Sequence, residues 1–189
     1  MLCYNLKEYQ NILLNLSIRA LVADYLSLLR LNVGFIVHQT IGYCRDFDFD
    51  IPSLSLEPDL SLSSLKGVVR VSRTPQGLLL DVKMSANTPA ECVRCLETFS
   101  QSLSVDFSEL YAFDKRSVTE SGLILPENGY INLAPVLREF LILDIPIRPI
   151  CMETCKGLCL ECGTNLNLST CEHAAAKNSS SFDTLQSQE

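Results

Sequence analysis

Polar and apolar residues alternate with a period of two along much of the chain between residues 45 and 113. The run Asp46–Ile51 alternates acidic and apolar side chains, which predicts a strand with one buried face. The segment Lys66–Ala90 predicts a β-hairpin, because two alternating arms flank the turn sequence Thr74–Gly77. A further alternating run extends from Leu103 to Phe107. Short turns join these strands, so we predict an antiparallel sheet that is partly barrel-like.

The spacing of apolar residues changes to a helical period after a polar, turn-rich loop at residues 114–128. Five apolar residues recur at i, i+3, i+4, i+7 and i+8, which predicts an amphipathic helix at about 133–143. They are Leu133, Val136, Leu137, Phe140 and Leu141. Asn132 is a candidate cap, and Pro146 ends the helix. We expect its apolar stripe to cover one face of the sheet, so the fold class is α+β with a C-terminal Cys-rich zinc-binding segment.

Composition divides the chain into four predicted parts. Residues 1–29 form an N-terminal extension of undefined status, and residues 30–150 form the β-rich core. Residues 151–173 form a zinc-binding segment that closes on the core, and residues 174–189 are a Ser-, Gln- and Asn-rich tail that we expect to be disordered. No apolar run reaches the roughly 20 residues that a membrane span requires, so no membrane is expected. With clustered thiols and no clear secretory signal, the expected location is cytoplasmic.

The net charge of −7 limits how this chain can contact RNA. Affinity for a phosphate backbone depends on clustered cations, so any contact must use a local basic patch. The candidate cations lie on the predicted hairpin or near the cysteines. The alternative for each is that it is an ordinary solvent-exposed charge without a role in RNA binding. They are Arg70, Arg73, Lys83, Arg94, Arg148 and Lys156.

Nine cysteines in 189 residues are spaced like metal ligands, since five of them lie between residues 151 and 171. Two Cys-x-x-Cys pairs, a Cys-x-x-x-Cys pair and a Cys-x-His pair provide eight ligands in all. These are Cys92, Cys95, Cys151, Cys155, Cys159, Cys162, Cys171 and His173. A tetrahedral structural zinc ion takes four ligands, so the set predicts two closed zinc sites.

The spacing leaves the assignment of ligands to sites open. The preferred arrangement joins Cys92 and Cys95 to Cys151 and Cys155, and it leaves the other four ligands for a second site. The alternative joins Cys92 and Cys95 to Cys159 and Cys162 as a zinc ribbon. Two further alternatives are a single zinc site, with the other thiols unligated, and a redox-active dithiol. A redox pair normally opens a helix after a parallel strand, and neither Cys-x-x-Cys pair has that context.

Histidine chemistry offers little support for catalysis. Only two histidines are present, and a ligating His173 would not be free to act as a base. His38 lies in an apolar stretch, where we expect it to pack. Eight ligands for two ions leave no open coordination position for a zinc hydrolase. We therefore predict no catalytic residue and no small-molecule substrate.

Four strings of residues carry a resemblance to a known family. They are Glu91–Leu96 (ECVRCL), Ile131–Cys151 with its Asp-Ile-Pro-Ile segment, Cys155–Cys159 (CKGLC) and Cys162–Asn167 (CGTNLN). Over about residues 30–173 the chain resembles the YceD family, the large ribosomal RNA subunit accumulation proteins. His173 is a departure, because members often end the second site with Cys-x-Cys.

The resemblance implies a role in accumulation or processing of 23S rRNA and in assembly of the large ribosomal subunit, without an established catalytic reaction. The expected partner is pre-23S rRNA or a large-subunit ribosomal protein. We therefore predict a non-enzymatic ribosome biogenesis factor stabilised by structural zinc. The alternatives are a protein adaptor that binds a basic ribosomal protein, favoured by the acidic balance, and a thiol redox protein.

Overall fold

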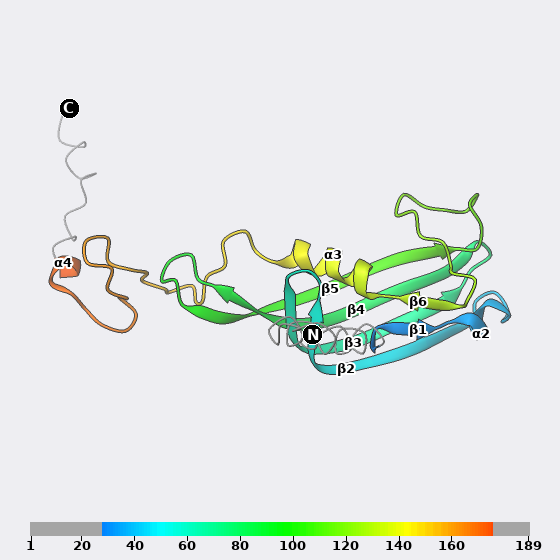
Figure 1. Cartoon of the computed structure of the whole chain (residues 1–189), viewed down its shortest axis with the longest axis horizontal. Helices are drawn as coiled ribbons and strands as arrows, with labels where there is room; N and C mark the ends of the chain where they lie inside the picture. Colours follow the sequence, from blue (N-terminus) through cyan, green and yellow to red (C-terminus); the bar gives the residue numbers. More distant parts are fainter. Residues whose placement is uncertain (1–27, 176–189) are drawn as a thin grey trace, which may run out of the picture. The chain divides into compact units, whose positions relative to one another are not determined.

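The computed structural model describes residues 28–175, so the predicted extension and tail fall almost entirely outside the described residues (Figure 1). The chain divides into two compact units. Within the described range, the first contains residues 28–88 and 102–145, and the second contains residues 89–101 and 146–175. The elements are β1 (Arg30–Asn32), α2 (Gly34–Val37), β2 (Cys44–Leu56), β3 (Leu60–Arg73), β4 (Gly77–Glu91), β5 (Thr98–Ala112), β6 (Tyr130–Asn132), α3 (Ala134–Asp144) and α4 (Glu172–Ala175).

A four-stranded sheet of order β2-β3-β4-β5 dominates the first unit. The predicted hairpin is confirmed, because Arg73 pairs with Leu78 and the Thr74 N–H donates to the Gly77 carbonyl at 2.9 Å. The predicted strand at 46–51 lies within β2, where Phe47, Phe49 and Ile51 face the core and the aspartates face solvent. The sheet is open, with β2 and β5 at its edges, which confirms an α+β class built on an antiparallel sheet.

The strand β3 is irregular near its middle, and just beyond the irregularity its backbone approaches β4 closely. The register between β3 and β4 shifts between Ser63 and Lys66, and Ser64 has a positive φ of 52°. The neighbouring Gly67 lies so close to β4 that a Cβ there would stand 2.1 Å from the Lys83 carbonyl oxygen. Glycine is therefore required at this position for the two strands to pair.

The predicted helix is confirmed as α3. The cap prediction is wrong by one residue, because the N-cap is Leu133, although the Asn132 side chain accepts a hydrogen bond from the Ala134 N–H at 3.1 Å. The helix ends at Asp144, two residues before Pro146. Three residues of the apolar stripe, Leu133, Leu137 and Leu141, are buried in the core of the first unit. Phe140 stacks on Phe107 of β5 with ring centroids 3.8 Å apart, so the helix covers one face of the sheet (Figure 1).

The short pair β1–β6 is not predicted by the sequence pattern, because three residues are too few to show a period. Leu31 pairs with Ile131, and both side chains are buried. The expectation that His38 packs is wrong. The helix α2 turns Ile36 into the core, and His38 follows its last turn on the exposed side. Among the described residues, no helix is long and apolar enough to cross a bilayer.

Candidate metal centres

The second unit gathers eight potential metal ligands into two clusters of four. In each cluster the candidate ligand atoms all lie within 4.8 Å of one another. The first cluster is Cys92, Cys95, Cys151 and Cys155, and the second is Cys159, Cys162, Cys171 and His173. The structure thus brings the ligands together in the preferred arrangement rather than as a ribbon of Cys92, Cys95, Cys159 and Cys162.

The geometry of the first cluster fits a tetrahedral ion. The Cys92 and Cys155 sulfurs are 3.9 Å apart, and the Cys95 and Cys151 sulfurs are 3.7 Å apart. Four sulfurs at about 2.3 Å from a zinc ion would be about 3.8 Å apart at the corners of a tetrahedron. The separations are far too long for disulfide bonds, which span about 2.05 Å. Three of these cysteines are buried, so an ion here would be shielded from solvent.

Turns of the backbone aim N–H groups at the sulfurs. Four cysteines accept a hydrogen bond from the backbone two residues ahead: Cys92 from Arg94, Cys95 from Glu97, Cys155 from Gly157 and Cys162 from Thr164. The residue after each second knuckle cysteine has a positive φ, 59° at Leu96 and 70° at Gly163. Both Cys-x-x-Cys pairs therefore form the same kind of turn, although one uses leucine where the other uses glycine.

These hydrogen bonds separate the acidities of the thiols. The backbone N–H of Cys151 is the main reason that the pKa of Cys92 falls to about 6. Burial opposes ionisation of Cys155, but bonds from the Asn167 amide and the Gly157 N–H lower its pKa nonetheless. Burial and the neighbouring thiols raise the pKa of Cys151 to about 12. The lowered pKa values favour thiolates at some of these cysteines. A bound cation would stabilise the thiolate form of the others as well.

Arg94 joins the two chain segments that build the first cluster. Its Nη1 donates to the Cys155 carbonyl at 3.1 Å and to the Glu153 carbonyl at 3.4 Å. Its own carbonyl accepts the Leu158 N–H at 3.0 Å. That close approach requires Gly157, which has φ +76° and whose Cβ would stand 3.0 Å from the Arg94 oxygen. This predicted RNA contact therefore has a structural role within the second unit.

The second cluster is more open than the first. Cys159 is buried, whereas Cys162 and His173 are exposed. The Thr164 hydroxyl lies 3.2 Å from the Cys162 sulfur and is the first of several hydrogen-bonding groups that lower the pKa of this thiol to about 6. The short helix α4 carries His173 two residues after Cys171. Three sulfurs and an imidazole are a donor set that suits zinc.

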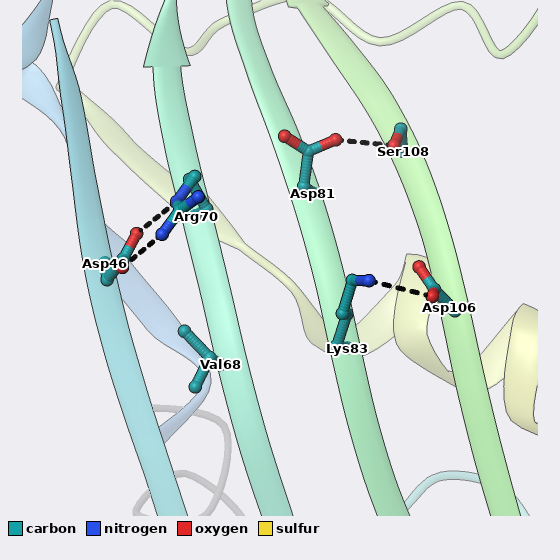
Figure 2. A pocket seen from close by; sticks show the side chains of 7 residues that line it. All are labelled: Asp46, Val68, Arg70, Asp81, Lys83, Asp106 and Ser108. Carbon is teal, nitrogen blue, oxygen red and sulfur yellow. Dashed lines mark hydrogen bonds and ion pairs between the residues drawn. The ribbon is translucent and has the colours of Figure 1, made fainter.

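The predicted RNA contacts on the sheet are largely neutralised by neighbouring acids. Arg70 makes two bonds to Asp46, at 2.7 and 2.8 Å, and Lys83 pairs with Asp106 at 3.2 Å (Figure 2). These groups line a shallow groove across the outer face of the sheet, with Asp81 and Ser108 beside them. The groove presents paired charges rather than a basic patch.

The other predicted contacts differ in their surroundings. Arg73 is half-buried, with its guanidinium 4.3 Å from the centre of the Phe113 ring and its Nε donating to the Val37 carbonyl at 3.1 Å. Arg148 and Lys156 are exposed in the second unit, and the described residues offer neither side chain an ion pair. Three of the six predicted cations belong to the first unit and three to the second.

The spacing of the predicted ligands did not identify Asn167, which contacts the first cluster. The Asn167 amide donates to the Cys155 sulfur at 3.3 Å. Its one signal in the sequence is its place in the Asn-Leu-Asn string that follows the second knuckle.

Comparison with known proteins gives a consistent set of similarities. A family model described as large ribosomal RNA subunit accumulation protein YceD matches residues 80–187, more than half of the chain. An uncharacterized protein of Mycobacterium leprae is 30% identical over 102 residues, which cover 52% of this chain and 47% of the relative. An uncharacterized protein of Mycobacterium tuberculosis is 30% identical over 104 residues, with 52% and 49% covered. The chain thus spans about half the length of these relatives.

A plant protein matches over a shorter segment. The chloroplastic large ribosomal RNA subunit accumulation protein YCED homolog 1 of Arabidopsis thaliana is 43% identical over 47 residues, which cover 25% of this chain and 15% of the relative. No solved structure matches the chain.

Proposed function

Because the chain belongs to the YceD family of large ribosomal RNA subunit accumulation proteins, we propose that it is a non-enzymatic ribosome biogenesis factor. In this role it supports accumulation or processing of 23S rRNA and assembly of the large ribosomal subunit in the cytoplasm. The observation that carries the proposal is the pair of four-ligand clusters, since both lie wholly inside the region that the family model matches. Each cluster holds a structural zinc ion.

Zinc in these sites has a folding role. Four protein ligands complete a tetrahedral coordination shell, so neither ion has a position for a catalytic water. The hydrophobic cluster of the second unit is small, with Phe99 and Ile150 as its only non-cysteine members among the described residues. Metal binding therefore adds folding free energy to that of this small core. Zinc binding also occupies the thiols that a redox protein would need.

Charge favours a protein partner as the second candidate. The described part of the second unit carries three Lys and Arg residues against five glutamates. Seven thiolates exceed the charge of two Zn²⁺ ions by three, so the loaded unit becomes more acidic. This supports an adaptor that binds a basic large-subunit ribosomal protein. Contact with pre-23S rRNA would depend on the exposed cations Arg148 and Lys156.

The cellular role is tested by depletion and complementation in the source organism. We expect depletion to lower 23S rRNA relative to 16S rRNA, or to accumulate the 23S precursor, without a matching loss of small-subunit particles. Wild-type protein restores the ratio, and a Cys92→Ser, Cys95→Ser double variant does not. The matched control is Cys44→Ser, which removes an exposed cysteine outside both clusters. A normal ratio after depletion would contradict the proposed function.

The two candidate partners are separated by binding measurements at increasing salt. If RNA is bound directly, an Arg148→Glu, Lys156→Glu double variant weakens binding to a 23S rRNA fragment and reduces the salt slope by about two. The matched control is Arg70→Glu, since the native Arg70 is already paired with Asp46. If the double variant leaves RNA binding unchanged while a basic ribosomal protein still binds, the adaptor is favoured.

A further inference from the structure

Asn167 forms a bridge around the first cluster. Its Nδ2 donates to the Cys155 sulfur at 3.3 Å and to the Asn165 Oδ1 at 2.9 Å. Its Oδ1 accepts the Lys156 N–H at 2.8 Å. A single half-buried amide thus holds both the sulfur of Cys155 and the backbone of the residue that follows it. Outer groups of this kind fix a metal ligand in place and reduce the charge on its sulfur.

Asn167 belongs to a segment whose ends are ligands of the second cluster. It lies between Cys162 and Cys171, both of which contribute sulfurs to that cluster. The segment folds back on residues 156–159, with the Leu166 N–H donating to Gly157 and the Cys159 N–H donating to Thr164, each at 2.9 Å. An ion in the second site would therefore fix the loop that delivers the Asn167 amide to the first.

A second contact follows a parallel route. The Asn165 Nδ2 lies 3.4 Å from the Glu97 carboxylate. The backbone N–H of Glu97 donates to the Cys95 sulfur, and its carbonyl accepts the Cys92 N–H at 2.9 Å. The same loop therefore reaches both chain segments that supply ligands to the first cluster.

We propose that the two metal sites are coupled, so that binding at one raises the affinity of the other, and that Asn167 is the positioning residue that transmits the effect. This inference rests on the proposed zinc sites. An ion in the second site restricts the loop from Gly163 to Thr170, so less conformational entropy is lost when the Asn167 amide meets the Cys155 sulfur. By linkage the effect is reciprocal.

The test uses Co²⁺ as a probe in the full-length chain. A site with four sulfurs and a site with three sulfurs and an imidazole give different visible d–d spectra, so the two affinities can be followed separately. Cys162→Ser disables the second site at an exposed ligand. We expect it to weaken Co²⁺ binding at the first site by about 5-fold or more.

Substitution of Asn167 isolates the connection. Asn167→Ala should weaken the first site by about 10- to 100-fold. In that background, adding Cys162→Ser should change the first site by less than about 2-fold, because the connection is already broken. Asn167→Asp keeps an acceptor for the Lys156 N–H but loses the donor to sulfur, so we expect it to shift the thiolate charge-transfer band of the first site.

The matched control is Asn128→Ala in the first unit. Like Asn167, Asn128 accepts a backbone N–H with its side chain, here that of Tyr130 at 3.0 Å, but it belongs to neither cluster. It should leave both Co²⁺ affinities unchanged. Two ions that bind independently, with the first site unaffected by Cys162→Ser and by Asn167→Ala, would overturn the coupling while leaving the zinc sites intact. Failure of the wild-type chain to bind Co²⁺ or Zn²⁺ would overturn the sites and the coupling together.

Discussion

Gly157 and Gly163 share a backbone conformation but differ in their surroundings, which makes them a matched pair. Their φ angles are +76° and +70°. A Cβ at Gly157 would stand 3.0 Å from the Arg94 carbonyl oxygen, whereas a Cβ at Gly163 would meet nothing within 4 Å. We expect Gly157→Ala to destabilise the zinc-loaded second unit by about 1–2 kcal/mol more than Gly163→Ala, because it also disturbs the Leu158–Arg94 hydrogen bond.

That difference can be measured by competing each variant against a zinc chelator. Equal losses in the two variants would mean that the φ angle alone, and not the approach to Arg94, makes glycine necessary at position 157.

The lowered thiol pKa of Cys162 predicts its reactivity in metal-free protein. Because its pKa is about 6, Cys162 is mostly thiolate at pH 7, and its exposure makes it accessible. We expect it to react with iodoacetamide faster than buried Cys92, whose pKa is also about 6. The rate should fall as the pH drops through about 6, as the thiolate is protonated.

Mass spectrometry of labelled peptides gives the rates, and zinc should protect Cys162 while leaving exposed Cys44 unprotected. A pH-independent rate at Cys162 between pH 5 and 7 would contradict a thiol pKa of about 6.

Residue-scale chemistry was predictable from spacing where the ligands are close in sequence. The Cys-x-x-Cys pairs can be recognised as metal ligands from the sequence alone, because two intervening residues let both sulfurs face one ion. The role of Asn167 depends on a turn that brings it back to Cys155, twelve positions earlier. The positive φ of Leu96 has no local sequence signal either, since glycine is the usual residue in that conformation.

At the scale of elements, the contact between β3 and β4 depends on Gly67. A Cβ there would stand 2.1 Å from the Lys83 oxygen and 2.6 Å from the Met84 Cα, and both are backbone atoms that cannot turn away. We expect Gly67→Ala to destabilise the first unit by about 3 kcal/mol. The control is Gly42→Ala, where φ is +91° and nothing lies within 4 Å.

Urea unfolding followed by far-UV circular dichroism measures both changes. If Gly67→Ala costs no more than Gly42→Ala, the two strands have room that this structure does not show.

The elements with a clear period were predictable, and the short ones were not. Alternation along β2 and β5 and the helical stripe of α3 each extend over enough residues to show which face is buried. The three-residue strands β1 and β6 depend on pairing with each other across about 100 residues of sequence. The exposure of His38 likewise depends on where α2 ends.

At the scale of the whole molecule, the sequence identifies the ligands but not their grouping. Cys92 and Cys95 could pair with either of two later sets, and the choice depends on how the turn between β4 and β5 meets the chain after α3. The ion pairs of the basic side chains were also not predictable from the sequence. Arg70 and Lys83 read as available cations in the sequence, but each has a carboxylate partner on a neighbouring strand.

We propose above all that one chain holds two structural zinc ions. Native mass spectrometry of the full-length protein, purified without chelators, measures this directly. We predict a mass that corresponds to two bound zinc ions, and one ion fewer in Cys162→Ser supplied with excess zinc. A wild-type protein that carries one zinc ion or none under these conditions would contradict it.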